Sequence, residues 1–139
     1  MTRSLGEALS LLADKGDINL ENSISRGIEK ESLRVSKNNT ISTADHPSSL
    51  GSALTNKYIT TDFSEALLEL ITPAHSSVED VLKNLDEICK FVVEETPETM
   101  WPRSIPGKIA REDSISLADY GTSNSGLLKT LYRSGLSYR

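Results

Sequence analysis

Residues 57–73 read KYITTDFSEALLELITP, and this stretch decides the fold. Because β-branched and aromatic residues are frequent in it, we predict an extended segment from Lys57 to Thr72 that ends before Pro73. Alternate side chains of a strand point to the same side, which places Glu69 on one face together with apolar neighbours. A glutamate with apolar residues around it on both faces is difficult to place in water. Glu69 is therefore a candidate functional residue.

Asp62 is the second notable acid of this stretch, and strand alternation puts it on the face opposite to Glu69. A bulge or a bend between the two acids would bring both to one site. The alternative is a helix, in which Glu65 and Glu69 stand at positions i and i+4 on the solvent-facing side. The residues alone leave both structures open.

A second extended segment is predicted over residues 24–36, which combine β-branched residues with mixed polarity. Alternation places Glu29 and Glu31 on one face, which continues into Leu33. Two neighbouring carboxylates on an inward face repel each other unless a cation or a shared proton offsets their charge. The alternative is an edge strand whose charged face meets solvent and whose inward residue is Ile28.

These acids on adjacent extended segments suggest a chemistry. Hard divalent cations such as Mg²⁺ take carboxylate oxygens as ligands, often beside the phosphate groups of a substrate. The pattern therefore makes phosphate transfer a reasonable hypothesis.

The loop from Gly121 to Gly126 has the glycine spacing of a P-loop, but Leu127 stands where that motif demands lysine. We therefore reject a Walker motif. A helix that begins near Ser125 would still offer backbone N–H groups to an anion, with Lys129 and Arg133 adding positive charge. An ordinary junction between a loop and a helix is the alternative.

Two helices are predicted from capping-box patterns. The first pattern lies at residues 4–7, and the helix carries leucines on one face and stops near Gly16. The second pattern lies at residues 76–79 and opens a helix over 76–96 with apolar residues at helical spacing. Cys89 lies on the apolar face of that helix, so we expect core packing and not reactivity.

The composition excludes several classes of protein. The chain has 139 residues, enough for one domain, and its net charge of −5 argues against a general nucleic-acid binder. It has no run of about 18 apolar residues, so we expect a soluble protein without a membrane span. With no export signal and a single cysteine, we expect the cytoplasm. His46 and His75 have no partners at metal or triad spacing and are expected at the surface.

The last residues, 132–139, carry no boundary signal and read as an interrupted sequence. Hydrophobic residues make up 37% of the chain, a modest share that fits faces buried by further chain. We therefore expect residues 1–139 to be part of a longer protein.

Short blocks of the sequence match one family in order. The blocks are RGIEKESLRV (26–35), HP (46–47), LGSALT (50–55), ITTDFSEALLELITP (59–73), MWP (100–102), LADYGTSNSG (117–126) and KTLYR (129–133). Together they resemble bacterial glutamate–cysteine ligase of the proteobacterial type, also called γ-glutamylcysteine synthetase. The blocks run from about residue 24 to the end and are collectively specific, whereas the helix over 76–96 fits in position but is generic in sequence.

The resemblance implies an α+β catalytic fold related to glutamine synthetase, with an antiparallel sheet whose concave face holds metals, ATP and substrates. It implies ATP-dependent ligation of the L-glutamate γ-carboxylate to the L-cysteine amine via a γ-glutamyl phosphate, the first step of glutathione biosynthesis. Mg²⁺ would be the cofactor and ATP a co-substrate. Residues 1–139 would then be the N-terminal portion of a single catalytic domain, truncated at its C-terminal end and inactive alone.

Carried over residue by residue, Glu29, Asp62 and Glu69 are similar to the family's magnesium ligands in this part of the chain. Glu31 resembles the second strand glutamate near the metals and the bound cofactor. Tyr132 resembles a substrate-pocket residue on the cysteine side. Arg133 resembles a basic catalytic neighbour that we assign to phosphate.

The chain departs from the family in two ways. The family's enzymes are several times longer, and their remaining metal ligands and most of the nucleotide pocket lie beyond Arg139. The stretch 106–108 also varies, and we transfer nothing there. Two other functions stay open: a non-catalytic module that binds a metal or anion, and a carboxylate-metal phosphatase or nuclease that needs neither glutamate nor cysteine.

Overall fold

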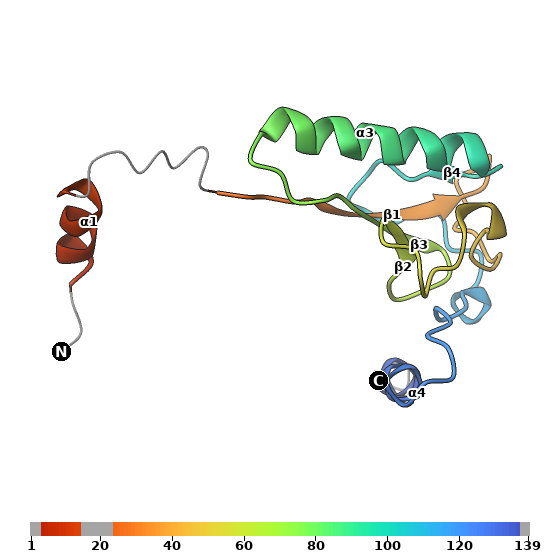
Figure 1. Ribbon diagram of the computed structural model, residues 1–139. Helices are drawn as coiled ribbons and strands as arrows, with labels where there is room; N and C mark the ends of the chain where they lie inside the picture. Colours follow the sequence, from red (N-terminus) through yellow and green to blue (C-terminus); the bar gives the residue numbers. More distant parts are fainter. Residues whose placement is uncertain (1–3, 15–23, 137–139) are drawn as a thin grey trace.

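The computed structural model describes residues 4–14 and 24–136, which form an α+β arrangement (Figure 1). The two larger helices lie on opposite sides of the sheet, with α3 on one side and α4 on the other. The elements, in chain order, are α1 (Leu5–Asp14), β1 (Glu29–Val35), the 3₁₀ turn η1 (Ser48–Leu50), β2 (Ile59–Thr61), β3 (Leu67–Ile71), α3 (Val78–Glu95), β4 (Thr99–Met100), the 3₁₀ turn η2 (Glu112–Ser114) and α4 (Asn124–Leu136).

The sheet is antiparallel, with strand order β2-β3-β1-β4, so the predicted α+β class with an antiparallel sheet is confirmed. Strand β1 pairs with β3 on one side and with β4 on the other. It is therefore an inner strand, and the alternative of a charged edge strand is wrong. The face that carries Glu29 and Glu31 is nevertheless the more exposed one, while Ser32 and Arg34 on the other face are buried.

The expectation of one extended segment over residues 57–72 is wrong in its middle, because residues 62–66 turn the chain back on itself. The Asp62 N–H donates to the Leu67 carbonyl at 3.1 Å, and the Leu67 N–H donates to the Ser64 carbonyl at 2.9 Å. Strands β2 and β3 thus form a hairpin, and the helical alternative for this stretch is also wrong. The turn reverses the alternation, so Asp62 and Glu69 both reach the same side of the sheet and line one cavity.

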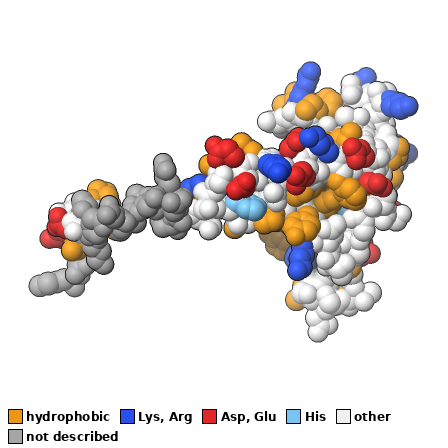
Figure 2. Space-filling model, turned by 45° about the horizontal axis from the view of Figure 1, so that its top comes forward, with side chains coloured by type: hydrophobic (Ala, Val, Ile, Leu, Met, Phe, Trp, Pro, Cys, Tyr) orange, Lys and Arg blue, Asp and Glu red, His pale blue; other side chains and the backbone are white. Residues whose placement is uncertain are grey.

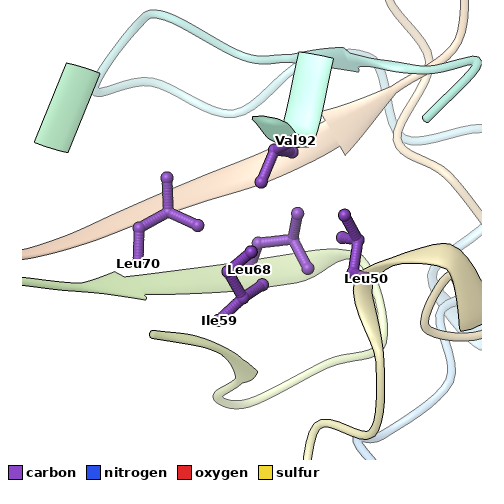
Figure 3. Packing of buried hydrophobic residues seen from close by; sticks show 5 residues of the cluster. All are labelled: Leu50, Ile59, Leu68, Leu70 and Val92. Carbon is purple, nitrogen blue, oxygen red and sulfur yellow. The ribbon is translucent and has the colours of Figure 1, made fainter. Parts of the chain in front are cut away.

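Helix α3 covers the other side of the sheet and builds the core. The predicted helix is confirmed, but its cap lies one residue later than the pattern at 76–79 indicates: the Ser77 hydroxyl accepts a hydrogen bond from the Asp80 N–H at 3.3 Å, and the helix begins at Val78. Val92 of α3 is fully buried against one apolar cluster (Figure 3), whose other members are Leu50, Ile59, Leu68 and Leu70. Cys89 packs partly buried against this cluster, and burial raises the pKa of its thiol, as expected of a core residue.

Arg34 is a buried cation between the sheet and the loops that follow it, with 1% of its surface exposed. Its guanidinium pairs with Glu98, just before β4. Nη2 donates to the carbonyls of Ala44 at 2.6 Å, Asp45 at 2.9 Å and Glu65 at 2.9 Å. One side chain therefore joins β1, the loop before η1, the hairpin turn and the β4 region.

The terminal helices keep apolar side chains exposed. The capping box before α1 is confirmed, since the Glu7 N–H donates to the Ser4 hydroxyl at 3.3 Å and the Ser4 N–H to Glu7 at 2.8 Å. The expected stop near Gly16 lies outside the described residues. Large exposed apolar side chains include Leu5, Leu9 and Leu12 in α1, and Leu127, Leu128 and Leu131 in α4.

The surface shows mixed charge on the side drawn in Figure 2, where acidic and basic side chains alternate with apolar ones. That side carries no continuous basic surface of the kind that binds nucleic acid. Within residues 4–14 and 24–136, no helix has both the length and the apolar character needed to cross a membrane.

Candidate functional site

Four acids share the face of the sheet that lies away from α3, and we call them the acidic face: Glu29, Glu31, Asp62 and Glu69. Glu31 of β1 stands directly opposite Glu69 of β3, and Thr60 of β2 stands opposite Glu69 on its other side. Residues paired in this way project to the same face. The β2–β3 hairpin brings Asp62 to Glu69, and the pairing of β1 with β3 adds Glu29 and Glu31, although Glu29 and Glu69 are 40 positions apart in the sequence.

The pKa of Glu69 reports how closely these acids gather. Burial raises it first, and the negative charges of Glu29, Asp62 and Glu31 raise it further. Lys129 of α4 acts in the opposite direction and lowers it. The structure thus brings together the four acids singled out from the sequence, and Lys129 lies close enough to act on Glu69.

A cavity of about 280 Å³ opens beside the acidic face. Its lining combines the hairpin, the loop before β2 and the start of α4: Ala53, Leu54, Thr60, Thr61, Asp62, Glu69, Asp119, Tyr120, Ser125, Gly126 and Lys129. The Lys129 ammonium lies 5.6 Å from the centre of the Tyr120 ring, which keeps this charge at the cavity. The cavity therefore presents carboxylates on one wall and a cation on another.

Hard divalent cations suit the chemistry of this donor set. Glu31 and Glu69 are like charges directly opposite each other, an arrangement that is unfavourable without a countercharge. Among residues 4–14 and 24–136, however, no three carboxylate, imidazole or thiolate groups already stand close enough to enclose a metal ion. The carboxylates lie on one face, and carboxylate oxygen is the kind of ligand that Mg²⁺ prefers. On binding, a cation would have to draw these carboxylates closer together.

Arg133 projects from α4 toward this site. Its Nη2 donates to Asp62 Oδ1 at 3.1 Å, and its guanidinium carbon lies 4.8 Å from the centre of the Phe63 ring. Tyr132, the next residue back, is 68% exposed and is not among the residues that line the cavity. The structure therefore places Arg133 at the acidic face, whereas Tyr132 is exposed and does not line the cavity.

Sequence reasoning missed Glu65 and Tyr120. Glu65 is buried, and its carboxylate accepts hydrogen bonds from the N–H groups of His46 and Asp119. The Tyr120 hydroxyl donates to the Asp62 carbonyl. Neither contact has a local signal, because each joins residues more than 15 positions apart.

His46 also differs from the expectation of a surface histidine. Burial, and next the charge of Arg34, lowers the pKa of its imidazole. Both of its ring nitrogens are buried, and they have no hydrogen-bond partner among the described residues. His46 lines a second cavity, of about 470 Å³, together with Glu65 and Asp119.

Comparison with known sequences identifies the family. A family model described as glutamate–cysteine ligase matches residues 9–139. The glutamate–cysteine ligase of Erwinia tasmaniensis is 47% identical over 140 residues, which cover 100% of this chain and 27% of that protein. The glutamate–cysteine ligase of Vibrio vulnificus is 51% identical over 115 residues, which cover 82% of this chain and 22% of that protein.

Solved structures agree. The crystal structure of glutamate–cysteine ligase from Francisella tularensis in complex with AMP matches with a TM-score of 0.77 and 43% identity, over 83% of this chain and 23% of that one. A bifunctional glutathione synthetase from Pasteurella multocida matches with a TM-score of 0.63 and 38% identity, over 66% of this chain and 13% of that one.

The chain spans about a quarter of the length of the curated relatives it matches, 27% and 22% of the two named above. Within that quarter, the match of the family model runs from residue 9 to the last residue, and it contains the whole acidic face. The chain belongs to the glutamate–cysteine ligase family.

Proposed function

We propose that the full-length protein is an ATP-dependent glutamate–cysteine ligase, which joins the γ-carboxylate of L-glutamate to the amine of L-cysteine in glutathione biosynthesis. One observation carries the proposal beyond family membership. Glu69 lies among three further acids on one face of the sheet, and Lys129 and Arg133 approach that face from α4. This is the charge pattern that a phosphoryl-transfer site requires.

The chemistry explains why acids and cations meet here. An oxygen of the glutamate γ-carboxylate attacks the terminal phosphorus of ATP, and ADP leaves, which gives γ-glutamyl phosphate. The cysteine amine then attacks the acyl carbon, phosphate leaves with its bonding electrons, and the nitrogen loses a proton. Both steps gather negative charge on phosphoryl and acyl oxygens, so the site needs positive charge held in place.

Glu29, Asp62 and Glu69 are the proposed ligands of Mg²⁺, and Glu31 lies beside them. Bound Mg²⁺ would supply the countercharge for ATP without exchange of protons. The support is the shared face, the direct opposition of Glu31 and Glu69, and the raised pKa of Glu69. A group whose charged form is strained by like charges is relieved when a cation binds.

Arg133 is proposed to act on the transferred phosphate. Its support is its position, since it already contacts Asp62 and a guanidinium matches phosphate oxygens in shape and charge. Tyr132 stays a proposed residue of the cysteine subsite. Because it is exposed on α4, any cysteine pocket around it needs chain beyond the residues described here.

We further propose that residues 1–139 form the N-terminal portion of one catalytic domain, located in the cytoplasm, that is inactive without the rest. The support is the share of the relatives that the chain covers, 27% and 22% of the two curated proteins, with a family match over residues 9–139.

The direct test measures γ-glutamylcysteine by mass spectrometry after the full-length protein is incubated with Mg²⁺, ATP, L-glutamate and L-cysteine. Glu69→Gln keeps the shape of the side chain and removes its charge, so product formation should fall about 100-fold or more. Glu94→Gln, an exposed position on α3, is the matched control and should keep the rate. A Glu69→Gln enzyme as fast as the wild type would contradict the metal-ligand proposal.

A further inference from the structure

Glu65 is a buried acid that stands outside the acidic face. It lies in the turn between β2 and β3, and 7% of its surface is exposed. Its Oε2 accepts the N–H of His46 at 2.7 Å, and its Oε1 accepts the N–H of Asp119 at 2.6 Å. One carboxylate therefore ties the hairpin turn to two loops that are 19 and 54 positions away along the chain.

The segment 116–120 adds further contacts to the same turn. The Glu65 N–H donates to the Ser116 carbonyl at 3.0 Å, and the Ala118 N–H donates to the Phe63 carbonyl at 3.2 Å. The Tyr120 hydroxyl donates to the Asp62 carbonyl. The backbone of Asp62, a proposed Mg²⁺ ligand, is thus held by its own turn and by this segment.

Arg34 is buried beside the turn and bonds to the backbone of the turn and of the loop before His46. Its Nη2 donates to the Glu65 carbonyl and to the carbonyls of Ala44 and Asp45, which precede His46. The Arg34 guanidinium thus holds the backbone of the turn, and the Glu65 carboxylate ties the turn to the backbone of His46 and Asp119. Hydrogen bonds to charged groups are about twice as strong as those between neutral groups, so the turn has little freedom to move.

The carboxylate of Glu65 is itself placed for support and not for chemistry. Asp62 and Glu69 line the cavity beside the acidic face, whereas Glu65 lines the neighbouring one with His46. Both of its oxygens already accept backbone N–H groups, one each. Glu65 therefore acts on the acidic face indirectly, through the backbone of the turn and through Asp119, which lines the same cavity as Asp62 and Glu69.

From these contacts we propose that Glu65 is a positioning residue: it fixes the turn that carries Asp62 and thereby sets the affinity of the acidic face for a divalent cation. The inference rests on the proposed function, because it takes Asp62 as a metal ligand. Groups that orient the ligands of a metal typically change its affinity when they are lost, even though they do not touch it.

The test measures Mn²⁺ binding to the full-length protein from the electron paramagnetic resonance signal of the free ion, with Mg²⁺ as the displacing competitor. Glu65→Gln keeps the size of the side chain but offers one oxygen to two N–H donors. Its Mn²⁺ dissociation constant should rise about 10- to 100-fold. Tyr120→Phe, which deletes one bond to the turn and buries no new charge, should weaken Mn²⁺ binding in the same direction, and it serves if Glu65→Gln does not fold.

Further variants distinguish a failure of the positioning role of Glu65 from a failure of the proposed metal site. Val92→Ala opens a hole in the core on the opposite side of the sheet, and it should lower the melting temperature while leaving the Mn²⁺ affinity unchanged. Wild-type Mn²⁺ affinity in both Glu65→Gln and Tyr120→Phe, or an equal loss in Val92→Ala, would overturn the positioning role. Unchanged affinity in Asp62→Asn and Glu69→Gln would overturn the metal site itself.

Discussion

Glu69 is a single residue whose ionised carboxylate lowers the stability of the folded, metal-free protein. Its carboxylate is partly buried, it stands opposite Glu31, and Glu29 and Asp62 add to the repulsion. Burial and these charges raise its pKa above the ordinary value of 4.5. The folded state therefore holds the Glu69 proton more tightly than the unfolded chain does, and stability falls as the pH rises through the interval above 4.5.

Removal of this charge should stabilise the metal-free protein at neutral pH. Glu69→Gln should raise the free energy of unfolding at pH 7 by an amount on the order of 0.5 kcal/mol, because one like-charge pair across the strands is lost. Below about pH 4 the gain should vanish, since Glu69 is then protonated in both states. Urea unfolding at the two pH values, with EDTA present, checks this; lower stability of the variant at pH 7 would contradict it.

Arg34 is the residue on which the loops around the hairpin depend. Arg34→Met should lower the free energy of unfolding by about 3–5 kcal/mol, because Glu98 loses its buried partner and three carbonyls lose their donor. Lys37→Met, in the exposed turn after β1, is the control and should stay within about 0.5 kcal/mol. The shift of the urea midpoint measures both, and equal midpoints for the two variants would refute the role given to Arg34.

At the scale of elements, the decisive event is the turn between β2 and β3. It moves Asp62 to the face of Glu69, and its turn-forming residues are only Asp62 and Ser64, with no glycine, proline or asparagine among residues 62–66. Without the stronger turn residues, residues 57–72 predict a single extended segment. Besides its two local backbone bonds, the turn is fixed by bonds to Arg34, Ser116 and Tyr120, which lie far away in the sequence.

Helix α4 brings Arg133 and Lys129 to the site, and its first turn packs very closely. A Cβ added at Gly126 would lie 2.1 Å from the Tyr120 carbonyl oxygen and 2.7 Å from that of Gly121. Gly126→Ala should therefore push α4 away and break the contact of Arg133 with Asp62. Hydrogen exchange of the α4 amides in the full-length protein should become faster.

Gly135 supplies the matched control in the same helix, because a Cβ there meets nothing within 4 Å. Gly135→Ala should slow exchange in α4, since alanine favours a helix over glycine by up to about 1 kcal/mol. Equal exchange in the Gly126→Ala variant and the wild type would show that the helix does not depend on this close contact.

Across the whole molecule, local sequence patterns predicted helices and extended segments, whereas contacts between distant segments could not be predicted. The capping-box pattern at residues 76–79 and the apolar spacing after it predicted α3 to within a residue or two at its start, because a helix closes its hydrogen bonds within a few residues. The alternation of residues along β1 correctly predicted that Glu29 and Glu31 share one face of the strand. It did not show that β1 is an inner strand of the sheet.

The four acids of the candidate site and Arg133 could be singled out from the sequence, whereas Tyr120 was missed and Tyr132 does not line the cavity. The acids were singled out by their apolar surroundings and by the resemblance to glutamate–cysteine ligase, which family membership now supports. The burial of Glu65, of Arg34 and of the ring nitrogens of His46 depends on pairs of segments that meet only after folding. The spacing of residues in one sequence does not show which distant segments meet, so only the structure could show the contacts that hold the site in place.

The central claim is that this acidic face serves an ATP-dependent ligation of glutamate to cysteine. The most direct measurement is ADP release by the full-length protein with Mg²⁺, ATP and L-glutamate, in the presence and absence of L-cysteine. We expect ADP release to depend on glutamate and to rise on addition of cysteine, with γ-glutamylcysteine as the product. A folded full-length protein that releases no ADP under these conditions would contradict it.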